Sequence, residues 1–258
     1  MKRFFRMYGV EQKLFFRSPD VILFNLAMPL VVFILITLIA GNKAAAGLVP
    51  LLAGLAIRFG MPLLEKTLMG FTGSPFVLLP YYGLFRFFSA SLSPAMLCFI
   101  AAMVMLEERD EQIDRYLIVT GLGRKGYFAS RIVIPALLAF AVTAVLLPLF
   151  NLTALSAAEV FFFSLTGTVQ GVLMALLIVS FSSNKLEGMA ATKLSSLMIF
   201  GAVVPFFVPS PVRFFFAFLP SFWMGKVILE NDLLYALLSV FAAGSWIMLL
   251  WRVYNGKT

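Results

Sequence analysis

The chain contains no histidine and a single cysteine, and only 12% of its 258 residues are charged. The missing histidine removes histidine-ligated haem, most zinc hydrolases, and nucleophilic catalysis by Ser-His or Cys-His pairs. The single cysteine, Cys98, excludes an internal disulfide framework and any CxxC metal site. We therefore expect no catalytic residue, no bound metal and no cofactor held by this chain.

Apolar residues, by contrast, make up 62% of the sequence and are spread over nearly its whole length. Soluble globular domains carry roughly 25% charged residues, and a soluble core could not bury this much apolar surface. Lipid must therefore solvate most of the chain. We predict an all-α membrane protein with a single transmembrane domain over residues 1–258, because a helix satisfies its own backbone inside the bilayer.

Six uncharged segments are long enough to cross a bilayer, which takes about 20 helical residues. They predict transmembrane helices at about 21–40, 87–106, 132–150, 160–182, 194–212 and 233–251. Three further apolar stretches, at 44–57, 67–85 and 214–225, are too short or too rich in glycine and proline to be included. We interpret them as external re-entrant or interfacial helices. If the first two of these both crossed, the count would be eight, with the same orientation.

Basic residues are distributed unevenly over the segments that flank these spans. Of the 20 lysines and arginines, 14 lie at the two termini or in the loops after the second and fourth spans, and six lie on the opposite side. The positive-inside rule therefore places both termini in the cytoplasm of a cell, with the chain in the cell membrane, interpreted as a bacterial inner membrane. The net charge of +8 follows from this topology, and no soluble face is left to bind nucleic acid.

Two amphipathic segments lie on the predicted cytoplasmic side. Residues 1–20 mix aromatic and basic side chains and predict a helix in the membrane interface, either a lipid anchor or a docking surface. The segment at 107–118, directly after the second span, holds five of the chain's 12 acidic residues. Its charged and apolar residues recur at helical spacing, which predicts one helix with two faces. That helix is either a solvated loop element or a docking element for a soluble partner.

With these elements in this order, the chain resembles the membrane subunits of type-2 ATP-binding-cassette (ABC) exporters over nearly its full length. The resemblance includes the basic N-terminal helix, LEERDEQIDRYLIVTGLGRKGYFASR at 106–131, and SSNKLEGMAATK at 182–193 before a Pro-rich fifth span. The Glu-Arg-Asp loop is most similar to that of fluoroquinolone-type drug export permeases. Those relatives continue into a Thr-Pro pair, whereas here Thr120 is followed by Gly121.

The resemblance implies a permease of an ATP-driven exporter, with ATP bound and hydrolysed by two copies of a separate ATPase subunit. A second permease subunit, identical or related, would complete a dimer in the membrane lipid. The cargo would be a hydrophobic or amphipathic drug, lipid or peptide that leaves the cytoplasm or inner leaflet. The resemblance also implies that the helix at 107–118 is a cytoplasmic coupling helix. Its candidate coupling residues are Glu107, Glu108, Arg109, Asp110, Asp114 and Arg115.

Gly167 and Gly171 form a GxxxG pattern in the fourth span, which predicts close helix packing within the subunit or across a dimer. Two other function classes are alternatives to the exporter. A non-transporting ABC-type sensor or immunity subunit would share the same architecture. A channel is less favoured, because the sequence shows neither a charged ring nor a carbonyl-filter motif.

Overall fold

The computed structural model describes residues 50, 52–60, 62–63, 66–67, 82–119, 123–150, 155–208 and 211–257. All of them belong to one compact unit, Pro50–Thr258. The expected interfacial helix at 1–20 and the first expected span at 21–40 lie outside the described residues. The expected external stretches at 44–57 and 67–85 are described only in part.

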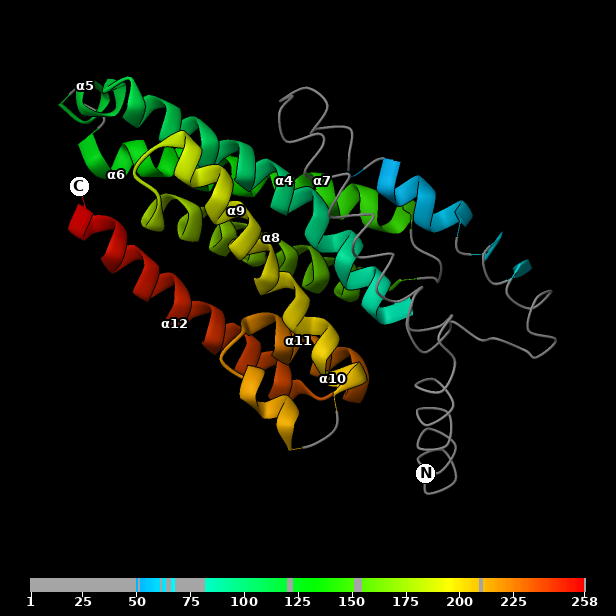
Figure 1. Ribbon diagram of the computed structural model, residues 1–258. Coiled ribbons are helices and arrows are strands. Elements are labelled where there is room, and N and C mark those ends of the chain that lie inside the picture. The colour runs from blue at the N-terminus through cyan, green and yellow to red at the C-terminus, as the bar shows by residue number, and fades with distance from the viewer. Residues whose placement is uncertain are drawn as a thin grey trace. The chain divides into compact units, whose positions relative to one another are not determined.

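The described residues form helices and no strand, which confirms the all-α class (Figure 1). Residues 52–60 are helical. The elements that follow are α4 (Tyr82–Asp110), α5 (Ile113–Val119), α6 (Gly123–Phe128), the π-helix η2 (Ala129–Val133), α7 (Ile134–Phe150), α8 (Ala157–Phe181), α9 (Lys185–Phe200), the 3-10 helix η3 (Gly201–Val203), α10 (Val204–Phe207), the 3-10 helix η4 (Val212–Phe216), α11 (Pro220–Glu230) and α12 (Leu233–Lys257).

Five stretches of the described chain are long and apolar enough to cross a membrane. They are Tyr82–Asp110, Gly126–Phe150, Ala157–Phe181, Lys185–Phe207 and Leu234–Gly256. These five overlap the second to sixth expected spans, so the chain is a multi-pass membrane protein. The six-span count remains a prediction, because the first expected span lies outside the described residues.

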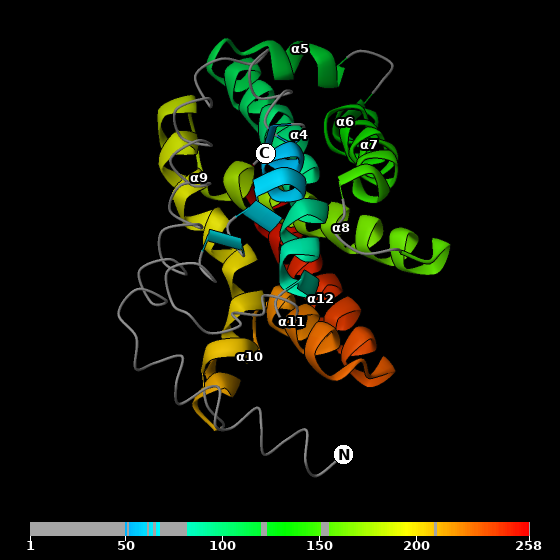
Figure 2. The same ribbon diagram turned by 90° about the vertical axis from the view of Figure 1, so that its right-hand side faces the viewer.

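The short helices are placed at opposite ends of this bundle. Both views show α5, α6 and the C-terminus at one end, which we call the α5 end, and α10 and α11 toward the other (Figures 1 and 2). The two short helices η4 and α11 occupy the region for which the sequence predicted a hairpin before the last span. The short helices thus lie at the ends of the long helices and do not interrupt them.

Helices α4 and α8 pack closely because two glycines of α8 let the backbones meet. A Cβ added at Gly171 would lie 2.7 Å from the carbonyl of Pro94, and one added at Gly167 would overlap the carbonyl of Ala90. Pro94 has no N–H, so the helical hydrogen bond to Ala90 is missing and that carbonyl is left to face α8. The GxxxG pattern therefore packs against a helix of the same chain.

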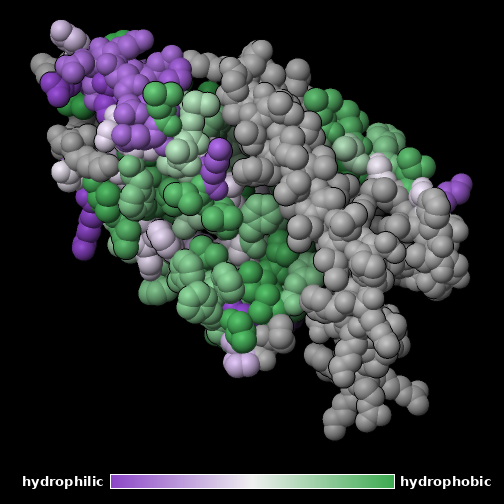
Figure 3. All heavy atoms as spheres, viewed as in Figure 1, coloured by the Kyte–Doolittle hydropathy of each residue, from purple (hydrophilic) through white to green (hydrophobic). Residues whose placement is uncertain are grey.

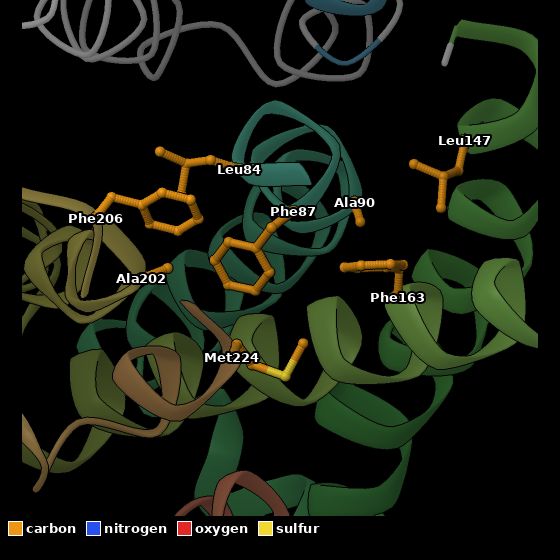
Figure 4. Packing of buried hydrophobic residues seen from close by; sticks show 8 residues of the cluster. All are labelled: Leu84, Phe87, Ala90, Leu147, Phe163, Ala202, Phe206 and Met224. Carbon is orange, nitrogen blue, oxygen red and sulfur yellow. The ribbon is translucent and has the colours of Figure 1, made fainter. Parts of the chain in front are cut away.

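A hydrophobic cluster joins this α4–α8 pair to the elements at the other end of the bundle. Phe87 of α4 is fully buried and lies between Ala202 and Met224 on one side and Phe163 of α8 on the other (Figure 4). Nearby, an ion pair of 3.2 Å between Arg86 and Glu159 connects the first turns of α4 and α8. The two central helices are thus held together along their length.

The expected fifth span at 194–212 is misplaced at both ends. Its helix begins at Lys185, where the side chain of Asn184 accepts a hydrogen bond from the backbone N–H of Glu187. It then continues past the exposed Lys193 and ends at Phe207, because Val208 is extended before Pro209. The predicted bounds followed the run of uncharged residues alone. The helix instead begins after its N-cap residue, Asn184, and ends before Pro209.

Candidate functional site

The α4 helix carries four of the six expected coupling residues beyond its membrane-spanning part. It has 29 residues, which is about 44 Å at about 1.5 Å per residue, against a hydrocarbon core of about 30 Å. Residues 107–110 form its last turn. Because helix and span are one continuous element, any displacement of this turn displaces the span.

The expectation of one continuous helix over 107–118 is wrong. The backbone N–H of Gln112 donates to the carbonyl of Arg109 at 3.1 Å, and Gln112 itself is left-handed, with φ of 61°. A left-handed residue ends an α-helix, and the chain restarts as the short helix α5. Glutamine rarely adopts this conformation. Because the position holds neither glycine nor proline, the residue types here do not predict the break.

Glu108 connects α4 to the segment that leads into α7. Its carboxylate accepts a hydrogen bond of 2.9 Å from the Tyr127 hydroxyl and one of 3.0 Å from Nε of Arg131. A second guanidinium N–H of Arg131 donates to the other carboxylate oxygen. The Glu108 side chain is 12% exposed and that of Arg131 is 35% exposed, so the carboxylate is largely shielded from water, and the fork-like contact is geometrically specific. Arg131 lies in the π-helix η2, and π-turns occur frequently at functional sites.

Glu107 and Asp110 connect α4 to the start of α9. Nζ of Lys185 lies 3.0 Å from a carboxylate oxygen of Glu107. The backbone N–H of the same lysine donates to the carboxylate of Asp110, also at 3.0 Å. The first N–H groups of a helix have no partner within it, and the helix dipole favours an anion there. Asp110 therefore supplies an acceptor and a favourable charge at the beginning of α9.

Arg109 connects α4 to the ends of α8 and α12. Its guanidinium donates to the backbone carbonyl of Ser182 at 3.0 Å and approaches that of Val179 at 3.4 Å. The last carbonyls of a helix lack partners within it, so a cation is favourable at this end of α8. The same guanidinium lies 5.9 Å from the ring centre of Tyr254 in α12.

These contacts make residues 107–110 a meeting point, which we call the α4 hub. Four consecutive side chains reach four different parts of the bundle: η2 with α6, the end of α8, the start of α9, and α12. The sequence suggested that these residues meet a partner protein, whereas the structure shows that they bind other helices of the same chain. The hub partners Tyr127, Arg131, Lys185 and Tyr254 were missed, because residues far apart in sequence give no local signal of their pairing.

The other two expected coupling residues, Asp114 and Arg115, lie on α5, outside the hub. Asp114 accepts a hydrogen bond of 2.9 Å from the backbone N–H of Arg115, so it serves its own helix. Arg115 is exposed, and so are Ile113 and Tyr116, the latter by 76%. Hydrophilic residues gather at this end of the molecule, while the face of the body seen in the same view is largely hydrophobic (Figure 3). Helix α5 therefore presents a mixed apolar and basic face to water.

The hub does not resemble a catalytic or metal site. Among the residues that the structure describes, no group of three histidine, cysteine or acidic side chains is placed to bind a metal ion. Its acids are paired with cations or helix ends, which is an arrangement that holds elements together.

Comparison with known proteins matches the chain to one family model. A family model described as "Fluoroquinolones export permease protein Rv2686c-like" matches residues 43–254. No curated protein and no solved structure matches the chain. The matched region covers four of the five described membrane helices, the hub and α5, and the fifth membrane helix up to residue 254.

Proposed function

The chain belongs to the Rv2686c-like family of fluoroquinolone export permeases, and on that premise we propose that it is the membrane subunit of an ATP-driven drug exporter. In this proposal two copies of a separate ATPase subunit bind and hydrolyse ATP. A second permease subunit, identical or related, completes the transporter. The single membrane domain would include the expected helix at 1–20 and span at 21–40, with both termini in the cytoplasm of a bacterial cell.

The proposed cargo is a hydrophobic or amphipathic compound that reaches the exporter from the cytoplasm or the inner leaflet. The long helices support this, because their described faces are apolar and much of their surface is open to lipid. An ion would require charged groups along its path, whereas the polar side chains buried in α4 and α8, such as Ser91, Ser93 and Gln170, are neutral, and charge inside a bilayer is costly. A route along the interface between two permease subunits would need no such lining.

The α4 hub is the observation that carries the proposed mechanism. We assign ATPase docking to α5 and transmission to the hub, because α5 is exposed whereas residues 107–110 are engaged within the chain. A push on α5 would pass through two residues to the end of α4. The hub would then move α8, α9, α12 and the start of α7 together. This assignment gives Glu108 and Arg109 a transmitting role, and leaves Arg115 as the charged contact.

The docking surface is tested by substituting its exposed side chains without disturbing the hub. The double variant Arg115→Glu with Tyr116→Ala removes a cation and an aromatic ring, residue types that dominate interface energies at about 2 kcal/mol or more each. We expect the co-purified ATPase to fall by about tenfold or more, and drug export to fall with it. Reversing Asp110 would be a poorer test, because its carboxylate also serves the start of α9.

Arg252→Glu is the matched control, because Arg252 is also exposed and lies near the α5 end on α12. It changes the net charge by the same amount but leaves α5 intact, so ATPase binding and export are expected to persist. If the α5 double variant binds its ATPase and exports drug at the original rate, docking through α5 is rejected. If the parent complex hydrolyses ATP but exports no drug, the sensor alternative is favoured over the exporter.

A further inference from the structure

A short segment at the end opposite α5 has three-residue periodicity. Backbone hydrogen bonds run from Phe214 to Pro211 at 3.1 Å, from Ala217 to Phe214 at 3.0 Å, and from Leu219 to Phe216 at 3.0 Å. Each joins an N–H to the carbonyl three residues earlier, so three-residue turns flank η4 (Val212–Phe216) on both sides, from Pro211 to Leu219. In such a helix, side chains three residues apart lie one above another along a common edge.

One edge of this segment is wholly apolar and faces outward. It consists of Val212, Phe215 and Phe218, whose residues are 61%, 78% and 56% exposed. The next edge around the helix is only partly turned toward the protein: Phe214 is 45% exposed, and its ring lies 6.1 Å from that of Phe222 and 5.5 Å from Nζ of Lys226. We call residues 211–219 the aromatic wedge.

The aromatic wedge is held in place by two tryptophans of neighbouring helices. The indole N–H of Trp223 in α11 donates to the carbonyl of Ala217 at 2.7 Å. The indole N–H of Trp246 in α12 donates to the carbonyl of Phe218 at 2.7 Å. Its outward edge is therefore a fixed feature of the fold, presented by backbone that the bundle holds.

Arg213 places a cation beside this apolar edge. Its guanidinium lies 5.4 Å from the ring centre of Phe214. Among the described residues, the ion pairs involve Arg86, Arg131, Lys185 and Lys226, and none includes Arg213. The Nε atom of Arg213 is buried and has no hydrogen-bond partner in the described part of the chain. An arginine without an ion-pair partner is able to bind an anion through its terminal guanidinium nitrogens, whose planar arrangement matches a phosphate group.

We propose that the aromatic wedge is a phospholipid-binding element. Its outward edge lies among the acyl chains and Arg213 binds the phosphate of the same lipid layer. The wedge follows the end of the fifth-span helix at Phe207 and precedes the start of α12, so it lies at membrane-interface depth. Aromatic side chains are enriched at that depth, and long basic side chains extend toward headgroups there. Apolar area combined with a cation is the general basis of interfacial binding. The inference does not depend on the proposed transport function.

Depth in the bilayer is tested with a fluorescent probe at three equally exposed positions. Phe215 is 78% exposed, Phe241 on the membrane helix α12 is 75% exposed, and Tyr116 on α5 is 76% exposed. Each is changed to cysteine and labelled with bimane in phosphatidylglycerol nanodiscs, with the unlabelled Cys98, which is 1% exposed, as background. We expect lipids spin-labelled near the headgroup to quench position 215, and aqueous iodide to quench position 116. Position 241 is expected to respond most to spin labels deeper in the chain.

Two results would overturn lipid insertion. Quenching of position 215 by iodide, to the extent seen at position 116, would place the wedge in water. Quenching by neither agent would mean that another protein surface, such as a second copy of the chain, covers it.

The role of Arg213 is tested separately by Arg213→Gln, with Arg252→Gln as the matched control. Native mass spectrometry would measure retained phosphatidylglycerol against a phosphate-free galactolipid with the same acyl chains. We expect the preference for phosphatidylglycerol to fall about fivefold in Arg213→Gln and to stay unchanged in Arg252→Gln, since one interfacial arginine contributes about this much. Excess inorganic phosphate is expected not to compete, because it lacks the acyl chains. An unchanged preference in Arg213→Gln, or competition by free phosphate, would refute phospholipid binding by this residue.

Discussion

Lys226 and Glu230 form an ion pair whose two members differ sharply in exposure, and this predicts unequal effects of removing them. The Lys226 side chain is 2% exposed, whereas that of Glu230 is 37% exposed. The ammonium lies 4.6 Å from the ring centre of Tyr235 and 5.5 Å from that of Phe214. The ammonium thus lies between two aromatic rings, which we call the aromatic box, and approaches the Tyr235 hydroxyl at 3.4 Å. Glu230 is its one anionic partner in the described part of the chain.

We predict that Glu230→Met destabilises the protein far more than Lys226→Met. Removing the partner of a buried charge costs about 3–5 kcal/mol, because the charge that remains is neither paired nor hydrated. Two aromatic faces would offset about 1 kcal/mol of this. Removing Lys226 leaves a carboxylate that water already reaches, and methionine fills the box, so a loss of about 0–1 kcal/mol is expected. The double variant is expected to be close to the parent, since apolar replacement of a whole buried pair is often neutral.

Thermal unfolding in nanodiscs measures the difference. A change of 1 kcal/mol shifts Tm by about 2–4 °C in a chain of this size, so Glu230→Met is expected to lower Tm by on the order of 10 °C. Lys226→Met and the double variant are expected to stay within about 4 °C of the parent. Equal losses in the two single variants, or a larger loss in Lys226→Met, would refute the reasoning from burial.

Three further results are expected. Gly171→Leu is predicted to lower Tm well below that of Gly244→Leu, because a side chain meets the Pro94 backbone at Gly171 and meets nothing within 4 Å at Gly244. Glu108→Gln combined with Arg131→Gln is predicted to impair drug export no more than Glu108→Gln alone, because each change removes the same contact between these two residues. Losses of export activity that add in the double variant would contradict this. Impermeant maleimide applied outside cells is predicted to label cysteine at Pro211, which is exposed and off the apolar edge of the aromatic wedge, and to spare cysteine at Leu186; the opposite pattern would invert the topology.

Much of the fold follows from composition and from the spacing of charges. Long uncharged runs predict membrane helices because a helix of about 20 residues crosses the bilayer and satisfies its own backbone hydrogen bonds there. Five such helices appear in the described chain at the expected places. The predictions that are wrong concern helix ends, where a single residue determines whether a helix begins, continues or stops. Asn184 begins α9 before Lys193, and Gln112 divides the expected coupling helix by taking a left-handed conformation.

The candidate site was predictable in its position and unpredictable in its connections. Five acids in a few residues after a span marked the end of α4 as unusual. The spacing of Gly167 and Gly171 also predicted close helix packing, but not which helix these glycines pack against. Only the structure shows that the partner is α4, where Pro94 frees a carbonyl. Such a pairing depends on which helices become neighbours, and that is a property of the whole bundle.

The sequence by itself determined what surrounds this protein, because the balance of apolar and charged residues selects lipid as its solvent. It also determined which local segments are helical and where charge accumulates. Which groups those charges pair with is determined only by the tertiary structure. Glu108 meets Arg131, and Arg109 meets the end of α8, because folding brings distant residues within hydrogen-bonding distance. Local spacing governs helix formation through contacts three or four residues apart, whereas pairing between helices depends on packing that no local pattern encodes.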